Sequence, residues 1–517
     1  MGIASRILNP IARRLGYAPA KPVRRSRVNS RSAWGGMAAG QITDLLADLV
    51  SMARSVDSDL STLKRVQARS REICLNNSYG RQYLRLVRNN VIGPNGIRLQ
   101  LKIKNQDGTL DTFANNVIET AWKKWGERGT ATMDGRQSFI GIQRLAIESW
   151  ARDGEVLIRK VRTRNNPFQF ALQVFEADFL DFDLNKELPD GRICMGVEMD
   201  NWSRPRAYWM FETNPGDPHP RGGGSRTRRI PASEIIHLFI SERPGQTRGI
   251  PPMVAAIKNL NMLGKYEESE AIAARIAAAK MGFFTSEEGE SGFTGDDRDE
   301  LGNIIDEIEP GTFHRLPAGD DIKMFDPQHP NSNFAGFVKA LLRGLASGLG
   351  VSYNALASDL EGVNYSSLRA GDLKERDAWR DLQNWFIEDF CREVFSRGEV
   401  NWLRQSLDFG ALTPLDEARE DKYNASTWHP RGWQWVDPAK EVKANTDAIA
   451  AKLKTYTSCL AEQGIDLEEH LRAIKAEQDL ANELGVKLEI PGTQALPPAD
   501  AGDGATEQDP TQGQGDE

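Results

Sequence analysis

Apolar residues recur with helical spacing in several segments of the first part of the chain. A period near 3.6 predicts amphipathic helices, and the segments that show it are Ile42 to Leu60, Leu63 to Arg88, Phe113 to Trp125 and Phe139 to Ala151. The turn Ile92-Gly93-Pro94-Asn95-Gly96 should follow the second helix, because glycine and proline interrupt regular structure.

Short runs of alternating or β-branched residues predict strands among and after these helices. These runs are Leu99 to Ile103, Val156 to Ile158, Phe170 to Phe175, Met195 to Met199, Ala207 to Phe211 and Ile235 to Ile240. The segment Asn214 to Arg229 is rich in Gly, Pro and Arg, so we expect a surface loop there. Because helices and strands are interleaved, we predict that the first half of the chain forms a mixed α+β unit.

Two long helices are predicted in the middle of the chain. The first begins near Pro251-Pro252 and continues to Lys280. Its alanine-rich end fits either simple helix propensity or close packing between helices. The second carries an apolar stripe from Phe334 to Leu349, with Lys339 and Arg343 on a different face.

An acidic insert separates these two helices. Residues 287 to 309 hold ten acids and one base, Arg298, which is typical of a solvated face. A helical stretch from Arg298 to Ile308 and strand-like stretches at Thr312 to Leu316 and Ile322 to Phe325 predict a small β-α-β unit.

The remainder of the chain is mainly helical. A polar loop from Asp359 to Ser367 precedes a periodic helix from Arg369 to about Arg397. The segment Pro438 to Leu484 is helical, with a break at Gln463-Gly464. From Ala495 onward the chain has acids but no base, so we expect disorder.

Charge and composition restrict the function. The formal net charge of the 517 residues is −8, which does not suit a protein that grips DNA through its phosphates, but does suit a conduit past which DNA slides. Residues 1–31, with eight Arg and Lys and no acid, form a basic arm that is either simply flexible or touches DNA or a partner. The four scattered cysteines favour a reducing compartment, and no apolar run is long enough for a membrane span.

Catalytic signatures are absent from the sequence. Gly264-Lys265 is followed by Tyr266 and lacks the upstream glycine of a phosphate-binding loop. The acids at 296–309 could hold a divalent metal for phosphodiester cleavage, but such sites need carboxylates from separate elements, so solvation is the simpler interpretation. We therefore predict no enzyme activity, no metal and no cofactor.

Several segments together resemble the lambda-type family of phage portal proteins, over roughly residues 60 to 475. The similar segments are Ser70-Arg71-Glu72 through Tyr79, Val91-Ile92-Gly93, Ile230 to Phe239, Glu242 to Gly249, Phe337 to Tyr353, Gly362 to Ser367 and Trp428 to Trp433.

This resemblance implies an α+β portal fold, assembled as a dodecameric ring around an axial channel. The regions that it implies are a basic arm (1–35), a mixed wing (36–250 and 369–436), stem helices (251–280 and 328–357), a β-α-β clip (281–327), a tunnel loop (358–368), a helical crown (437–490) and a disordered acidic tail (491–517).

The resemblance also implies a role and partners. The ring would sit at one capsid vertex, assemble with major capsid and scaffolding proteins in the host cytoplasm, bind terminase during packaging, and later bind head-completion and tail proteins. Double-stranded DNA would pass transiently and without sequence preference. We expect no membrane partner.

Candidate contacts follow from these regions. For the channel they are Asn364, Tyr365, Ser366, Ser367, Lys339 and Arg343, although the loop could be an ordinary turn and the two cations could pair with acids of a neighbouring subunit. For partner docking at the clip they are Glu287, Glu288, Asp296, Asp297, Asp299 and Glu300. The alternatives are a nuclease or motor subunit of the packaging machine and a protein-binding adaptor that never meets DNA.

Overall fold

The computed structural model describes residues 55–217, 226–278, 282–286, 320–324, 334–361, 365–433, 438–463, 465 and 467–486. The chain divides into two units, residues 1–58 and 59–517, and every contact discussed below lies within the second. The basic arm, the acids of 287–309 and the acidic tail lie outside the described residues, as do the helix expected at Arg298 to Ile308 and the strand expected at Thr312 to Leu316.

Four helices form the first part of the second unit: α3 (Leu63–Asn76), α4 (Ser78–Val91), α5 (Thr112–Trp125) and α6 (Phe139–Asp153). The prediction of a single helix from Leu63 to Arg88 is wrong, because the helix is interrupted at Asn77. This residue is extended, and its side-chain oxygen accepts hydrogen bonds from the backbone N–H groups of Tyr79 and Gly80. An asparagine in this role caps the helix that follows it, so α3 and α4 are separate helices.

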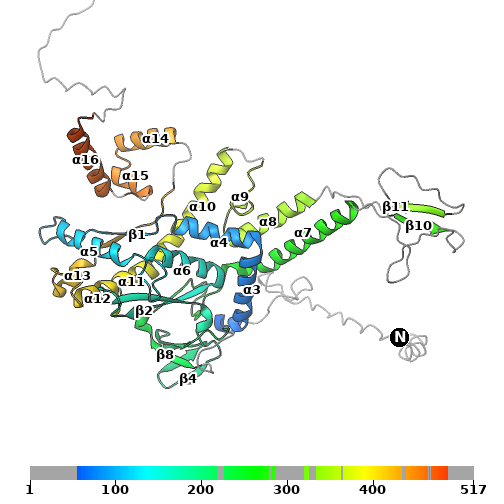
Figure 1. Cartoon of the computed structure of the whole chain (residues 1–517), viewed down its shortest axis with the longest axis horizontal. Coiled ribbons are helices and arrows are strands. Elements are labelled where there is room, and N and C mark those ends of the chain that lie inside the picture. Colours follow the sequence, from blue (N-terminus) through cyan, green and yellow to red (C-terminus); the bar gives the residue numbers. More distant parts are fainter. Residues whose placement is uncertain are drawn as a thin grey trace, which may run out of the picture. The chain divides into compact units, whose positions relative to one another are not determined.

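The strands form antiparallel sheets in the described chain (Figure 1). The three-stranded sheet has the order β3-β2-β9, with β2 (Glu155–Arg162), β3 (Phe170–Phe175) and β9 (Ile235–Phe239). The five-stranded sheet consists of β4 (Lys186–Leu188), β5 (Gly191–Cys194), β6 (Val197–Asp200), β7 (Pro205–Phe211) and β8 (Thr227–Pro231). The strand expected from Met195 begins only at Val197, because Met195 has a φ of 47° and belongs to a turn.

Strand β1 (Arg98–Leu101), from the first part of the unit, pairs with β12 (Ser426–His429), from its later part. In their antiparallel pairing Leu99 lies opposite Trp428. Because these strands are more than 300 residues apart in sequence, the mixed α+β unit is completed by the later part of the chain. The α+β class predicted from the sequence is therefore confirmed.

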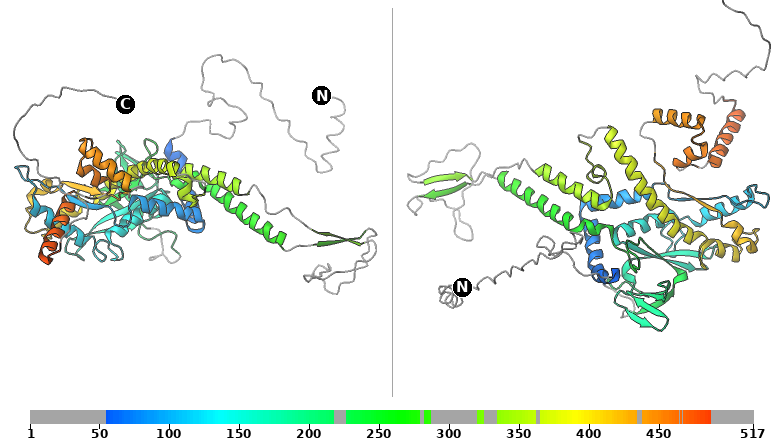
Figure 2. Two further views of the ribbon diagram at one scale, coloured as in Figure 1. Left: turned by 90° about the horizontal axis from the view of Figure 1, so that it is seen from above. Right: turned by 180° about the vertical axis from the view of Figure 1, so that it is seen from behind.

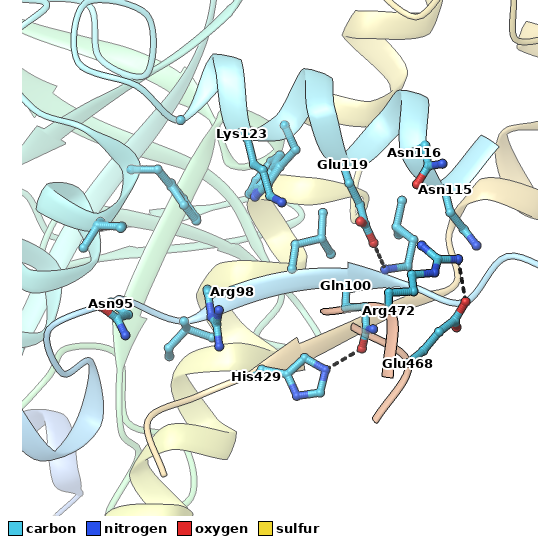
Figure 3. A pocket seen from close by; sticks show the side chains of 17 residues that line it. Asn95, Arg98, Gln100, Asn115, Asn116, Glu119, Lys123, His429, Glu468 and Arg472 are labelled. Carbon is cyan, nitrogen blue, oxygen red and sulfur yellow. Dashed lines mark hydrogen bonds and ion pairs between the residues drawn. The ribbon is translucent and has the colours of Figure 1, made fainter. Parts of the chain in front are cut away.

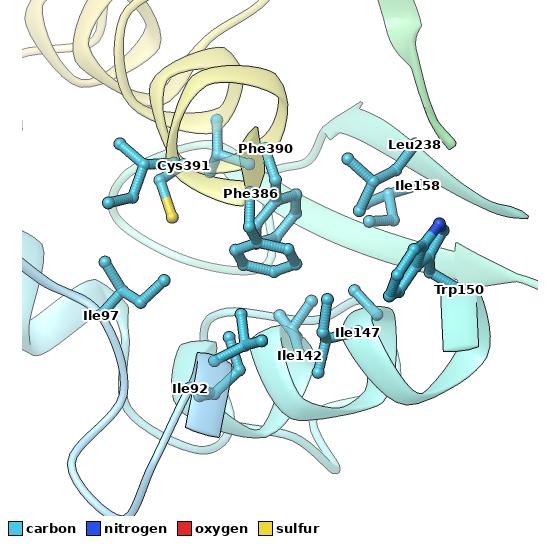
Figure 4. Packing of buried hydrophobic residues seen from close by; sticks show 14 of the residues in the cluster. Ile92, Ile97, Ile142, Ile147, Trp150, Ile158, Leu238, Phe386, Phe390 and Cys391 are labelled. Carbon is cyan, nitrogen blue, oxygen red and sulfur yellow. The ribbon is translucent and has the colours of Figure 1, made fainter. Parts of the chain in front are cut away.

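One hydrophobic core connects the helices to the three-stranded sheet. Figure 4 shows Phe386 and Phe390 pointing toward Ile142 and Ile147 of α6, and all four side chains are fully buried. Burial of each such side chain contributes roughly 1.5–3 kcal/mol relative to exposure. A second part of this core is aromatic, with Trp122 edge-on to Trp402 at a centroid distance of 5.0 Å.

The two long helices of the middle region pack against each other (Figures 1 and 2). A 3₁₀ turn, η6 (Pro252–Ala255), precedes α7 (Ile257–Ala278), so the helix expected from Pro251 begins with a tighter turn. The ring of Tyr266 on α7 stacks on Phe334 at 5.6 Å, at the start of α8 (Phe334–Leu349). Gly348, near the end of α8, lies against Ala255, so the helices are antiparallel.

Strands β10 (Gly282–Ser286) and β11 (Asp320–Met324) form an antiparallel pair between α7 and α8 in the chain. After α8 come α9 (Tyr353–Ala357), α10 (Tyr365–Phe386), the π-helical turn η7 (Ile387–Cys391), α11 (Arg392–Phe395), α12 (Trp402–Asp408) and α13 (Glu420–Tyr423). The last helices are α14 (Pro438–Ala450), α15 (Tyr456–Glu462) and α16 (Leu467–Leu484). Because α10 begins at Tyr365, the expectation that residues 365–367 belong to a loop is wrong: they form the first turn of this helix.

Candidate functional site

Four side chains converge just before residues 362–364, between α8 and the residues after α9. The Nζ atom of Lys339 lies 3.3 Å from Oδ2 of Asp359. The hydroxyl of Tyr353 donates a hydrogen bond to the same oxygen, at 2.6 Å. Arg343 lies over the Tyr353 ring, 5.6 Å from its centroid. We call Lys339, Arg343, Tyr353 and Asp359 the α8–α9 cluster.

The ionisation of the cluster is set by its hydrogen bonds. The Tyr353 hydroxyl, the backbone N–H of Glu361 and Lys339 together lower the pKa of Asp359 to about 2. Desolvation, followed by the hydrogen bond to Asp359, raises the pKa of Tyr353 to about 12. At neutral pH the cluster therefore contains a carboxylate and a neutral phenol, which suits the hydrogen bond between them.

The predicted channel residues have different surroundings. Lys339 pairs with Asp359 of its own chain. Arg343 has no carboxylate partner within the described part of the chain, where its contact is with an aromatic ring. Asn364 lies outside the described residues, and Tyr365 to Ser367 are placed only as backbone, on the first turn of α10.

The residues predicted for docking at the clip, Glu287, Glu288, Asp296, Asp297, Asp299 and Glu300, all lie outside the described residues. Sequence reasoning missed Tyr353 and Asp359. The available signal was local: Ser352 is a typical helix cap, and Asp359 opens the polar loop that the sequence marks.

A buried ionic network lies where the chain enters η6 and α7. Arg248 donates from Nε and Nη2 to the carboxylate of Glu155 at distances of 2.6 to 2.9 Å, and both side chains are almost completely buried. His237 Nε2 lies 2.9 Å from the same carboxylate, and the backbone N–H of Gly249 donates to it. Despite its burial, the pKa of Glu155 is held well below the ordinary value by Arg248 and His237.

Two glycines allow the chain before β2 and the chain before η6 to pack closely against each other. We call this contact the junction. A Cβ atom on Gly154 would lie 2.3 Å from the carbonyl carbon of Ile250, and Gly154 has a φ of +83°. A Cβ atom on Gly249 would lie 2.1 Å from the Gly154 carbonyl oxygen. Backbone therefore touches backbone at the base of the long helices, a position at which only glycine fits.

A cavity of about 470 Å³ lies between β1, α5 and α16. Figure 3 shows three interactions among the residues that line it. His429 Nε2 lies 2.6 Å from the Gln100 side-chain oxygen, Glu119 accepts from a backbone N–H of β1, and Arg472 is paired with Glu468. Because these groups are mutually satisfied, the cavity offers no evident acid–base or nucleophilic centre.

The described part of the chain lacks two further features. No group of three or more His, Cys, Asp or Glu side chains is arranged to hold a metal ion. Among the same residues, no helix combines the length and the hydrophobicity that a membrane span requires.

Comparison with known proteins defines the class. The chain belongs to the phage portal proteins, lambda family, because the model of that family matches residues 43–383. It is 38% identical over 432 residues to the probable portal protein of Halomonas phage phiHAP-1, covering 83% of this chain and 82% of the relative. It is 23% identical over 455 residues to portal protein B of Escherichia phage lambda, covering 81% and 84%. The predicted family resemblance is therefore confirmed.

Chains of two solved particle structures align with most of this chain. A chain from the neck of an empty GTA particle has a TM-score of 0.42 and 15% identity, with coverage of 81% of this chain and 97% of that one. A chain from the neck of the native GTA particle also has a TM-score of 0.42, with 12% identity, 78% coverage of this chain and 94% of the other.

Proposed function

We propose that twelve copies of this chain close into a ring at one capsid vertex, and that duplex DNA enters and leaves through the channel of the ring. Membership of the portal family supports this assignment. In it α7 and α8 are the stem, residues 281–327 the clip, the segment 358–364 before α10 the tunnel loop, and α14 to α16 the crown. The protein performs no covalent chemistry and needs no cofactor.

The observation that carries the tunnel assignment is the α8–α9 cluster. Asp359 is tied to Lys339 and Tyr353 three residues before the segment 362–364. Asp359 also accepts the backbone N–H of Glu361 at 2.9 Å, which turns the chain at the start of the loop. The cluster fixes the point from which the loop leaves α9.

The charges of the cluster suit a lining that lets DNA slide. Because Lys339 is neutralised by Asp359, its attraction for phosphate is weakened. Arg343 keeps its charge without a carboxylate partner in the described chain. One exposed cation per subunit, together with short polar groups at Asn364, Ser366 and Ser367, would make weak and reversible phosphate contacts.

The test is the double variant Asn364→Ala/Tyr365→Ala in a phage that carries this gene. We expect rings of normal appearance in negative-stain micrographs and a shorter packaged genome on pulsed-field gels. Asp359→Asn should have the same effect by releasing the loop. Asp377→Asn, on α10 with only a surface pair to Arg380, is the matched control. Full-length packaging by both test variants would refute the tunnel assignment.

Terminase binding is assigned to the clip acids. In the proposed ring these carboxylates are repeated in every subunit, so together they would attract a basic surface of terminase. Co-sedimentation of purified rings with terminase should therefore be lost when Lys replaces Glu287, Glu288, Asp296, Asp297, Asp299 and Glu300. Unchanged binding would exclude this docking surface. The major capsid and scaffolding proteins, and later the head-completion and tail proteins, complete the proposed set of partners.

Two rival functions make different predictions. A nuclease or motor subunit would show nuclease or ATPase activity in purified form. An adaptor that never meets DNA would form no rings with a central hole. Family membership favours the portal assignment over both.

A further inference from the structure

A pocket lined by five arginines lies among helices α3, α4 and α6. Its volume is about 570 Å³. The arginines are Arg71 from α3, Arg81, Arg85 and Arg88 from α4, and Arg152 from α6. We call it the arginine pocket. The lining also includes two acids, Glu148 and Glu176, so the arginines outnumber the carboxylates in the pocket.

Three of the five arginines are already neutralised. Arg88 pairs with Glu148 at 3.0 Å. Arg152 and Arg71 share the carboxylate of Asp153, each at 2.8 Å. These pairs hold the walls of the pocket together and use the carboxylates that surround it.

Arg81 and Arg85 are different, because both are exposed and neither side chain has a hydrogen bond or ion pair within the described chain. They are one helical turn apart on α4, so their charges lie side by side and repel each other. The Nη2 atom of Arg71, which also lines the pocket, is buried and lacks a hydrogen-bond partner. The pocket therefore has donors ready for an additional anion.

The chemistry of the rim favours a protein carboxylate over a DNA phosphate. Leu75 is 67% exposed and lines the pocket together with Leu84. Arginine is enriched at the core of protein interfaces, and the exposed Leu75 adds apolar surface that a protein partner would bury. All five cations are arginines, whose planar fork binds a carboxylate through two parallel hydrogen bonds. A recessed pocket also suits a protruding side chain better than the convex surface of a duplex.

We propose that the arginine pocket is one half of the contact between neighbouring subunits and that it receives carboxylates from a second copy of this chain. This inference rests on the proposed ring. A ring repeats one contact between two different faces of the subunit. If the arginine pocket is one of these faces, charge complementarity requires acids on the other. The excess of acids over bases in the chain, 73 against 65, makes a second copy a suitable source of the carboxylates.

The experiment uses the full-length protein and the double variant Arg81→Glu/Arg85→Glu. Both side chains are exposed, so the fold should be retained, which circular dichroism and the thermal midpoint would verify. Native mass spectrometry over a dilution series should show that the subunit concentration needed for half-assembly rises about tenfold or more. Arg81→Lys/Arg85→Lys should give an intermediate rise.

The matched control is Arg162→Glu/Arg164→Glu, the same charge change at two exposed arginines at and just beyond the end of β2. Its assembly should equal that of the wild type. If Arg81→Glu/Arg85→Glu also assembles like the wild type, the pocket is not a subunit contact and the inference is overturned. If its rings are normal but their retention of a DNA duplex is lost, phosphate is the ligand and the inference is equally overturned.

A different result would affect the proposed function itself. If the wild-type protein formed no rings at any concentration, the ring would be refuted, and the subunit contact with it. Rings in the wild type together with rings in the pocket variant would refute only the contact. The two failures are therefore distinguishable in the same dilution series.

Discussion

Arg248 and Glu155 form a buried ion pair in which two guanidinium nitrogens contact the carboxylate at 2.6 to 2.9 Å. Glu155 begins β2, and Arg248 lies just before the turn that leads into α7. The pair thus joins the three-stranded sheet to the base of the long helices. Gln67 of α3 donates to the same carboxylate, at 3.1 Å, and completes its hydrogen bonds.

Glu155→Gln should destabilise the protein strongly. The substitution leaves Arg248 buried without its counter-charge, and loss of one partner of a buried pair costs about 3–5 kcal/mol. Urea unfolding followed by tryptophan fluorescence would measure the change in the free energy of unfolding. Asp377→Asn, which removes an exposed i,i+3 pair, should cost under about 1 kcal/mol. Equal effects of the two substitutions would show that burial adds nothing to the Glu155 pair.

The contribution of Glu155 should depend on pH in a defined direction. Its folded-state pKa lies below the ordinary 4.5, since Arg248 and His237 outweigh the effect of burial. The carboxylate therefore increases the free energy of unfolding above pH 4.5, and this contribution declines as the pH falls toward the folded-state pKa.

The measurement is the difference in unfolding free energy between the wild type and Glu155→Gln. It should be constant from about pH 7 to 5 and should narrow below the ordinary carboxyl pKa of 4.5. A difference that grew on acidification would mean that the carboxyl is protonated in the folded protein.

Gly249→Ala should be much more harmful than Gly245→Ala. The new Cβ at residue 249 would lie 2.1 Å from the Gly154 carbonyl oxygen, so the backbone must move. Gly245 has a φ of +80° but nothing within 4 Å of a Cβ, so its substitution costs only the backbone strain, about 1–2 kcal/mol. Thermal midpoints of both variants and the wild type would compare the two costs. Similar midpoints for the two variants would show that the junction can relax.

Thiol reactivity should distinguish Cys194 from the other three cysteines. Cys74, Cys391 and Cys459 are buried, whereas Cys194 is partly exposed. Desolvation raises the pKa of Cys74 to about 11 and that of Cys391 well above its ordinary value, and only the thiolate reacts. In an Ellman titration of the native protein at pH 8, Cys194 should account for the fast phase. Persistence of that phase in Cys194→Ser would contradict this assignment.

The sequence predicted elements well where a strong period was bounded by clear stop signals. The helix from Phe334 to Leu349 and the strand from Phe170 to Phe175 have the predicted ends. The break at Asn77 was missed because the apolar period continues across it from α3 into α4. Only the geometry shows that the asparagine side chain turns back to cap the second helix.

The sites were less predictable, because they depend on residues that are distant in sequence. Glu155 and Arg248 are 93 residues apart, and neither residue type indicates a buried partner. Lys339 was identified as a cation on the polar face of its helix, but its partner Asp359 becomes evident only when α9 folds back beside α8. Sequence patterns indicate which face of a helix a side chain occupies, but not which residue of another element will contact that side chain.

The contact between Gly154 and Gly249 has a mechanical consequence. Two main chains meet there with no side chain between them, so no rotamer change can absorb a displacement. A force applied along α7 would therefore be transmitted to β2, and the helix would be rigidly connected to the sheet. Any bending under load would have to occur within the helices themselves.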